Sequence, residues 1–246
     1  MDFERIYYPE SKFGGFTRVD GTIDFYLRLN SLINGSSVLL DVGCGRGVYL
    51  EDPVTIRREL RQFIGRCQKV IGIDVDARAA ANPLLNEFRL IENGRWPVED
   101  ASVDLCVSDF VLEHIAQPES FFSECRRVLK TGGYLCIRTA NTRSYVGLIS
   151  RLVPERLHAP VLERVQPCQR KEEDVFPTLY RCNTKQKIRR MLNKYGFDCC
   201  VYEHEAEPYY LSFNRFCYWL GVIHQRFAPA AVKLAIFAFA RKRVTT

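Results

Sequence analysis

The 246-residue sequence lacks the features that would assign it at once to a secreted, repetitive or membrane-spanning class. Met1 is followed by DFERIYYPES rather than by basic residues and an apolar core, so no secretory leader is expected. No internal repeat or low-complexity tract is present. Neither C-terminal apolar run, 209–227 or 230–244, supplies the ~20 apolar residues that a membrane-spanning helix needs. We therefore expect a globular, cytoplasmic protein.

Paired cysteines are missing as well, although cysteine itself is abundant. None of the 10 cysteines forms a CxxC pair, and Cys199 and Cys200 are adjacent. In a protein that is not secreted, such cysteines are expected to be reduced and mostly buried. We therefore predict neither disulfides nor a metal site.

A strong charge of one sign is also absent. The net charge is +6, and the basic residues are scattered apart from Arg241-Lys242-Arg243. Without a basic stripe or an aromatic platform, a nucleic-acid partner has little support. The apolar C-terminal runs leave two interpretations open. One is contact with a membrane surface, where the basic end would favour anionic lipid; the other, which we favour, is a packed edge strand and lid.

Strand-like and helix-like segments alternate from Val38 onward, as in a parallel α/β sheet with helices on its faces. The first apolar run, SVLLDV, is continuous, which is typical of a strand buried on both faces. We expect strands at 37–42, 69–74, 88–91, 103–108, 134–140 and 197–203, and a final edge strand at 233–242. The predicted fold class is therefore α/β, with a mostly parallel, doubly wound sheet.

Capping residues and glycines predict four helices around this sheet. One covers 20–33. A second has Asp52 as its N-cap and Pro53 at its first position, and ends at Gly65. A third opens at Pro118 and is closed by Gly132-Gly133, and the fourth runs from Thr184 to Tyr195.

The stretch LLDVGCGRG, residues 39–47, predicts a ligand-binding turn at the end of the first strand. It is not a Walker A loop, because no Lys-Ser or Lys-Thr closes it. It also departs from the dinucleotide pattern G-x-G-x-x-G, since Val48 stands where the third glycine is needed. Asp74 ends the second predicted strand, where a carboxylate can accept both hydroxyls of a ribose. Together they indicate a nucleoside ligand.

Three segments resemble motifs of one enzyme family. Asp41 to Gly47 resembles motif I of the class I S-adenosylmethionine-dependent methyltransferases, 70–76 resembles their second motif, and 96–141 is similar to their third to fifth motifs. The resemblance is dense over 36–141, loose over 183–203, and nearest to the branch called methyltransferase type 11. It implies a Rossmann-like sheet, S-adenosylmethionine as cofactor, and methyl transfer.

Within motif I, the resemblance assigns cofactor contacts to Asp41, Gly43, Cys44, Gly45 and Gly47. Gly43 and Gly45 would let the backbone approach the methionine tail of the cofactor. Asp41 would position this loop and the cofactor's amino group, directly or through water.

Outside motif I, the resemblance implies that Asp74 binds the ribose and that Val75 packs on the adenine face. Asn93, or its neighbour Glu92, would meet the adenine amino group. The usual Gly-Asp-Ala is replaced here by Glu92-Asn93-Gly94.

The resemblance also points to the end of the fourth predicted strand. The Ser108 carbonyl, with Asp109, would lie near the methionine amino group. Ser108-Asp109-Phe110 stands where amino-methylating nucleic-acid enzymes carry an Asn/Asp-Pro-Pro-Tyr motif. His114 would face the methyl-transfer cleft, either as a general base or as a wall of the cofactor pocket. His158 is a second candidate base.

The resemblance implies one methyltransferase domain over 1–246. Its parts would be an N-terminal lid and helix (1–35), a cofactor-binding core (36–141), a substrate-side insertion (142–182), and a C-terminal part of the sheet with an apolar tail (183–246). We expect 1–19 and 142–182 to close over the cofactor and to form the acceptor pocket. Insertion arginines at 143, 151, 156, 164 and 170 would clamp an anionic substrate or form a solvated lid face.

The expected reaction is methyl transfer to an oxygen or nitrogen of a small-molecule, glycan or lipid-linked acceptor. Two alternatives remain. A nucleotide-binding oxidoreductase is disfavoured by Val48 and by the segment 96–141. A non-catalytic cofactor-binding protein would bind the cofactor without turnover.

Overall fold

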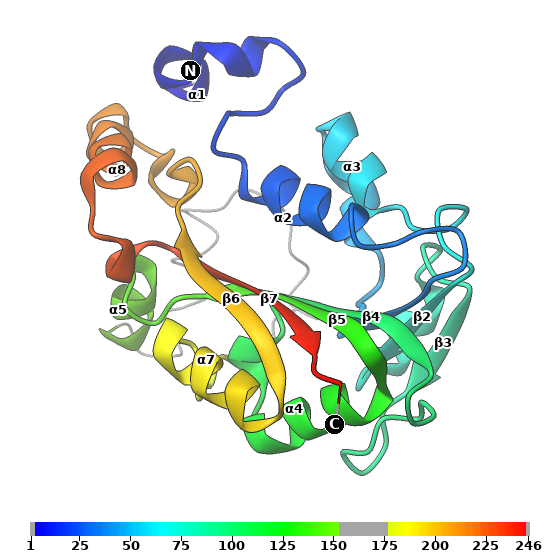
Figure 1. Ribbon diagram of the computed structural model, residues 1–246. Helices are drawn as coiled ribbons and strands as arrows, with labels where there is room; N and C mark the ends of the chain where they lie inside the picture. Colours follow the sequence, from blue (N-terminus) through cyan, green and yellow to red (C-terminus); the bar gives the residue numbers. More distant parts are fainter. Residues whose placement is uncertain (1–2, 153–176, 245–246) are drawn as a thin grey trace.

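The fold is known from a computed structural model that describes residues 3–152 and 177–244. Its centre is a seven-stranded sheet with the strand order β3-β2-β1-β4-β5-β7-β6 (Figure 1). The strands are β1 (Val38–Val42), β2 (Lys69–Asp74), β3 (Glu87–Leu90), β4 (Val103–Asp109), β5 (Leu129–Ala140), β6 (Phe197–His204) and β7 (Ala235–Lys242).

The central strands are parallel, as predicted. β1 pairs in parallel with β2 on one side and with β4 on the other, and β4 pairs in parallel with β5. The carboxyl ends of β1, β2 and β4 therefore meet at one edge of the sheet. Ligands of open α/β sheets bind at this edge, beside the strand where the order reverses, which here is β1.

The final strand is not at an edge, so that prediction was wrong. β7 pairs antiparallel with β5 and with β6, which leaves β6 at the edge. The reason is burial: Ile236, Phe237 and Ala238 are buried on successive positions, as in a strand covered on both faces. β6 is buried only at Phe197 and Val201, and Asp198 and Cys200 on its other face are exposed, as fits an edge strand.

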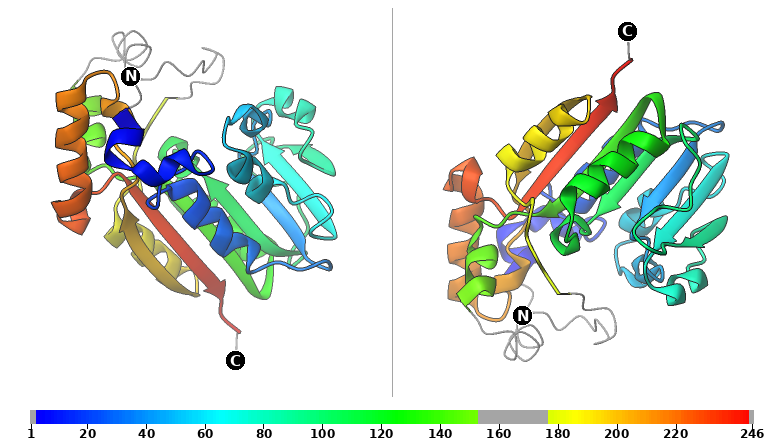
Figure 2. Two further views of the ribbon diagram at one scale, coloured as in Figure 1. Left: turned by 90° about the horizontal axis from the view of Figure 1, so that it is seen from above. Right: turned by 90° about the horizontal axis from the view of Figure 1, so that it is seen from below.

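Helices cover both faces of the sheet, as predicted. α2 (Gly21–Asn30) and α3 (Thr55–Arg61) lie on one face, while α4 (Pro118–Val128) and α7 (Lys185–Lys194) lie on the other (Figures 1 and 2). Successive residues of β1 serve the two cores: Leu39 packs with the α2 side and Leu40 with the α4 side. The doubly wound α/β fold is therefore confirmed.

Several predicted helix ends are wrong: α2 ends at Asn30 rather than at 33, and α3 ends at Arg61 rather than at Gly65. The second helix begins at Thr55 rather than after Asp52, because the Asp52 side chain accepts a hydrogen bond from the Val54 N–H and forms a turn before the helix. α4 ends at Val128, and β5 begins immediately at Leu129. The pairing of β5 with β4 shifts between Leu129 and Tyr134, and Gly132 at φ 79° sits in this irregularity rather than closing the helix.

The other α-helices among residues 3–152 and 177–244 are α1 (Phe3–Tyr7), α5 (Tyr145–Leu152) and α8 (Arg215–Phe227). Short 3₁₀ helices cover Pro9–Lys12, Val48–Glu51, Ala77–Ala81, Leu112–His114, Tyr209–Leu211 and Ala230–Val232. The C-terminal apolar runs are thus α8 with the turn before it, and β7 with its approach. Among the described residues, no helix is long and apolar enough to cross a membrane.

Candidate functional site

The predicted glycine turn lies at the carboxyl edge of the sheet, between β1 and the end of β2. Gly43, Gly45 and Gly47 all have positive φ, at 71°, 54° and 78°. The Gly43 N–H donates to the Ile73 carbonyl at 2.8 Å, which fixes the start of the loop against β2. Only glycine adopts three left-handed positions in five residues without appreciable strain.

Asp74 stabilises this loop through a hydrogen bond to its carboxylate. One oxygen of its buried carboxylate accepts a hydrogen bond from the Gly45 N–H at 3.0 Å, and the other accepts one from the Asp76 N–H at 3.0 Å. A carboxylate has about four lone-pair positions, so these bonds leave room for a ribose hydroxyl at each oxygen. The ribose contact stays a prediction, and these hydrogen bonds give Asp74 a role in shaping the loop.

The three glycines face different surroundings. A Cβ atom at Gly43 would lie 2.5 Å from the Val111 side chain, and one at Gly47 would lie 2.6 Å from the Asn82 amide oxygen. A Cβ atom at Gly45 meets nothing within 4 Å. Gly45 therefore marks the open side of the loop, where a ligand has room. Val75, next to Asp74, is 65% exposed, so its side chain is accessible for the predicted packing on adenine.

Asn82 supports the same loop and has no counterpart in the sequence-based prediction. Its buried amide donates to the carbonyls of Cys44 and Gly45 at 3.0 and 3.1 Å, and its oxygen accepts from the Leu84 N–H. The Cys44 side chain is fully buried and lies close to Gly72. Any contact between Cys44 and a ligand must therefore come from its backbone.

Asp41 lies at the end of β1 among other acidic groups. Burial, with the neighbouring carboxylates of Asp109 and Asp74, raises the pKa of Asp41 to about 7, against the opposing effect of Arg61. Such a cluster is costly for the protein alone, and a ligand cation would relieve it. The site therefore fits a ligand that carries an ammonium group near Asp41 and a ribose at Asp74.

Asp109 forms an ion pair with Arg138 that the sequence does not predict. The Arg138 guanidinium donates to both of its oxygens, at 2.6 Å each, and the Tyr26 hydroxyl donates at 2.9 Å. Burial would raise the pKa of Asp109, but Arg138 outweighs that effect and the pKa is lowered. The neighbouring Ser108 hydroxyl is buried and finds no hydrogen-bond partner within 3–152 and 177–244.

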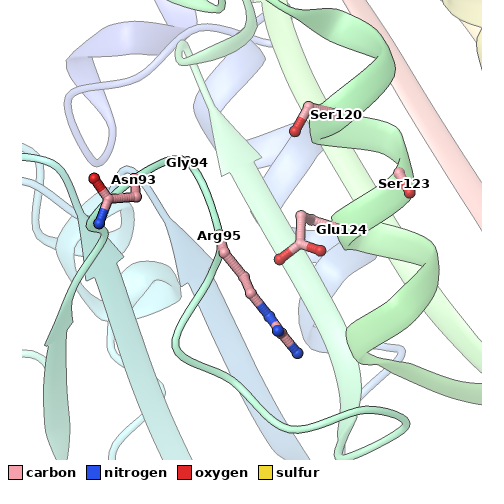
Figure 3. A pocket seen from close by; sticks show the side chains of 6 residues that line it. All are labelled: Asn93, Gly94, Arg95, Ser120, Ser123 and Glu124. Atoms are coloured by element: carbon pink, nitrogen blue, oxygen red, sulfur yellow. The ribbon is translucent and has the colours of Figure 1, made fainter.

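Asn93 lies at the tip of a turn that follows β3. It has φ 54° and Gly94 has φ 75°, and Glu92 pairs across the turn with Arg95. The Ile91 N–H donates to the Asp74 carbonyl at 2.8 Å, so this turn starts beside the predicted ribose contact. A hollow of about 300 Å³ lies between the turn and α4, and Figure 3 shows the Asn93 amide extending away from α4. Neither Asp74 nor the glycine loop lines this hollow, and the contact of Asn93 with adenine stays a prediction.

Known proteins share this loop and this sheet. Residues 40–137 match the methyltransferase domain family model. A probable S-adenosylmethionine-dependent methyltransferase of Mycolicibacterium smegmatis is 34% identical over 120 residues, which is 47% of this chain and 42% of that relative. The matched segment therefore resembles the class I S-adenosylmethionine-dependent methyltransferases. The predicted family and the predicted cofactor, S-adenosylmethionine, are thus confirmed.

Solved structures agree on the fold of this chain. An S-adenosylmethionine-dependent methyltransferase from Archaeoglobus fulgidus superposes with a TM-score of 0.54 at 18% identity, over 95% of this chain and 97% of that one. A possible histamine N-methyltransferase from Thermotoga maritima gives 0.53 at 15% identity, over 89% and 88%. These likenesses support the Rossmann-like fold alone.

His114 lies five residues beyond β4, at the carboxyl edge of the sheet. Its Nδ1 is 3.0 Å from the Pro177 carbonyl oxygen. The segment is held in place by Glu113, whose carbonyl accepts from the N–H groups of Leu179 and Tyr180. The Glu113 side chain is buried and accepts from the Thr139 hydroxyl at 2.7 Å, and burial raises its pKa. Sequence analysis missed Glu113, although it precedes the singled-out His114 directly.

The N-terminal segment of the chain is tied to the same edge by Arg57 on α3. Arg57 pairs with Asp20, the N-cap of α2, and with Glu207 beyond β6. The Thr17 hydroxyl donates to Glu207 at 3.0 Å. This arrangement agrees with a cover formed by 1–19, and the role of that cover as a lid stays a prediction.

The insertion arginines are only partly described. Arg143 is exposed just after β5, and Arg151 lies in α5. Arg156, His158, Arg164 and Arg170 lie outside the described residues. The acceptor pocket that we expect from 142–182 therefore stays a prediction.

Proposed function

We propose that this protein transfers the methyl group of S-adenosylmethionine to an oxygen or nitrogen atom of a small-molecule, glycan or lipid-linked acceptor. The observation that carries the proposal is the open side of Gly45 beside the Asp74 carboxylate, within the segment that matches the family. The match covers only 42% of the length of the M. smegmatis relative, so the activity of the whole protein is part of the proposal.

An oxygen acceptor is supported by one relative in particular. The ubiquinone biosynthesis O-methyltransferase of Nitrosomonas europaea is 29% identical over 154 residues, which is 54% of this chain and 61% of that enzyme. Its name describes methylation of an oxygen. We therefore place hydroxyl acceptors first among those to be tested.

S-adenosylmethionine supplies an electrophilic methyl group, so the protein's main task is to align the acceptor with it. Asp74 would hold the ribose. Asp41, once ionised, would hold the ammonium group, and the backbone at Gly45 would leave room for the methionine tail. These contacts would fix the reactive end of the cofactor at the carboxyl edge of β4.

A hydroxyl acceptor must also lose a proton, and the geometry at His114 suits that task. The Pro177 carbonyl can only accept a hydrogen bond, so Nδ1 of His114 must carry the hydrogen. In the neutral ring, Nε2 then holds the lone pair and can take the acceptor's proton. A histidine in this role contributes roughly 10²–10⁴-fold to the rate.

The test is a methyl-release screen. Purified protein is incubated with S-adenosylmethionine and with panels of phenols, amines, sugars and polyprenyl-linked compounds, and S-adenosylhomocysteine is measured. We expect release above background with at least one class. A parallel titration with NAD and NADH separates the oxidoreductase, which would bind them. Tight S-adenosylmethionine binding without release in any panel would instead favour the non-catalytic alternative.

A further inference from the structure

The helix α8, in the connection between β6 and β7, is apolar on both of its sides. Tyr218 and Val222 are buried against Phe3 and Tyr7 of the N-terminal segment, and the rings of Tyr7 and Tyr218 stack at 5.7 Å. A helix with one buried stripe normally presents polar residues on the opposite side. α8 does not.

The outward side of α8 carries five large apolar residues. Phe216 is 63% exposed, Trp219 41% and Phe227 79%, and Leu220 and Ile223 are exposed as well. Their spacing of three or four residues places them in one stripe along the helix. α8 lies at the flank of the molecule, outside the layers that cover the sheet (Figures 1 and 2). Such a stripe marks an interaction surface.

The charges of α8 narrow the choice of partner. The helix contains no acidic residue, and its two arginines, Arg215 and Arg226, are eleven residues apart, which is about three helical turns. They therefore lie on the same side, next to the apolar stripe. Within the described part of the chain, neither forms a salt bridge. Of the two, and among residues 3–152 and 177–244, only Arg226 has an acidic side chain, Glu10, close enough to interact. Two such cations beside an aromatic stripe are complementary to a surface that is apolar inside and anionic at its rim.

The first turn of α8 adds a place for an anionic group. A hollow of about 600 Å³ is lined by Tyr7, Asn214, Arg215, Phe216 and Trp219. It combines a cation with aromatic walls at the rim of the stripe. This composition suits a phosphate headgroup whose acyl chains lie against the neighbouring aromatic side chains.

We propose that the outward side of α8 docks on the surface of an anionic phospholipid membrane. α8 has 13 residues, about 20 Å of helix, so it lies on a bilayer rather than crossing the ~30 Å hydrocarbon core. The helix is fixed to the protein body, because His224 lies 3.3 Å from the buried Glu205 carboxylate and the Tyr8 hydroxyl donates to Gln225. The apolar stripe therefore stays outward. The inference is independent of the proposed methyl transfer.

The two tryptophans give the experiment a site-specific signal. Trp219 is in the stripe, whereas Trp96 is buried in the core at 6% exposure. In a Trp96→Phe protein, the fluorescence reports on Trp219 alone. We expect a blue shift on addition of vesicles of phosphatidylcholine with phosphatidylglycerol, and quenching when the lipids carry bromine in their acyl chains.

Variants then test the stripe and the charges by vesicle co-sedimentation of the full chain. Phe216→Ser with Trp219→Ser should lower the partition coefficient at least about tenfold, because two large apolar side chains no longer enter the bilayer. Arg215→Ala with Arg226→Ala should lower binding to anionic vesicles by about fivefold for each arginine. Leu27→Ser is the matched control, since Leu27 is 59% exposed, close to the exposure of Phe216, but lies on α2.

Several outcomes would overturn the proposal. The first is that the protein does not co-sediment with anionic vesicles. The second is that Trp219 fluorescence neither shifts nor is quenched when the vesicles are added. The third is that the Leu27→Ser control loses as much binding as the double serine variant. Self-association in analytical ultracentrifugation that the double serine variant abolishes would assign the stripe to a second copy of the chain. Binding to anionic vesicles that only the stripe and arginine variants weaken supports the membrane surface. S-adenosylmethionine binding measured on the same variants should be unchanged, so the two proposals fail separately.

Discussion

Asp109 and Arg138 stand opposite each other in the parallel ladder of β4 and β5, and two hydrogen bonds of 2.6 Å join their side chains. Both are almost fully buried. Tyr26 of α2 donates to the same carboxylate, so the pair also connects a helix of one face to the edge where the cofactor binds. A buried ion pair is a poor source of net stability, but breaking it leaves an uncompensated charge.

Removal of Arg138 should therefore destabilise the fold strongly. We expect Arg138→Leu to lower the free energy of unfolding by about 3–5 kcal/mol. The double variant Asp109→Asn, Arg138→Leu should recover part of this loss, because no charge remains buried. Lys194→Ala is the control, since its pair with Glu119 is mostly exposed and screened by solvent, so its loss should change stability little. Urea denaturation measures all three, and equal losses for Arg138→Leu and Lys194→Ala would contradict this interpretation.

Alanine variants at three glycines with positive φ can distinguish a residue that contacts the ligand from one that only supports the loop. Gly45→Ala should weaken S-adenosylhomocysteine binding at least about tenfold, since its Cβ enters the space left for the ligand. Gly47→Ala should mainly lower stability, because its Cβ meets Asn82. Gly65→Ala is the matched control: Gly65 has φ 83° and open surroundings, but it lies far along the chain from the loop.

Calorimetry of the three variants measures ligand affinity, and thermal unfolding measures stability, so the two methods together distinguish ligand contact from loop support. Gly45→Ala and Gly65→Ala should lose similar stability, about 1–2 kcal/mol for the left-handed backbone. If Gly45→Ala binds the ligand as well as Gly65→Ala does, the loop does not face the ligand at Gly45.

The pKa of Asp41, raised to about 7 by burial and by its carboxylate neighbours, makes cofactor binding depend on pH. A bound ammonium group favours the ionised carboxylate, so binding releases a proton and should weaken as the pH falls from 8 to 6. Folding has the opposite dependence. A carboxyl with a raised folded pKa stabilises the fold while protonated, and this contribution is lost as the pH rises from about 4 through about 7.

Asp41→Asn should flatten both dependences. Calorimetric titration with S-adenosylhomocysteine at pH 6 and pH 8, in buffers of different ionisation enthalpy, measures the affinity and the released protons. A wild-type affinity that is the same at both pH values, without proton release, would place the ammonium group away from Asp41.

His114→Asn tests the proposed base, because asparagine can still donate to the Pro177 carbonyl but cannot take a proton. With a hydroxyl acceptor, kcat should fall roughly 10²–10⁴-fold while the cofactor affinity changes little. If His114 only walls the cofactor pocket, the variant should lose cofactor affinity and keep its turnover at saturation. Near-normal turnover at saturating cofactor would remove His114 from catalysis.

The sequence predicts local features of this molecule well and long-range ones poorly. β2 was predicted with its observed bounds, because a strand buried on both faces is a continuous apolar run between polar turns. The position of β7 between β5 and β6 was missed, since strand pairing depends on partners far along the chain. Ile236, Phe237 and Ala238 are consecutive apolar residues, and that run is the signal that could have placed β7 in the interior.

In the site, too, local contacts could be predicted from the sequence and long-range contacts could not. Asp74 and the glycine turn lie within one βαβ unit, so their spacing alone brings them together. Arg138 and Tyr26 meet at Asp109 from segments 112 residues apart in the chain, and no local pattern announces that contact. Asn82 reaches the loop from a turn beyond β2, where Asn-Pro reads simply as a turn.

The central claim is that the edge beside Asp74 binds S-adenosylmethionine, and calorimetric titration tests it most directly. Wild-type protein should bind S-adenosylmethionine or S-adenosylhomocysteine and not NAD. Asp74→Ala should lose about 1.5–3 kcal/mol of binding free energy, because a charged hydrogen-bond acceptor is removed. Asp76→Ala, two residues away, should bind normally. Wild-type affinity in Asp74→Ala, or binding of NAD in place of S-adenosylhomocysteine, would contradict the account.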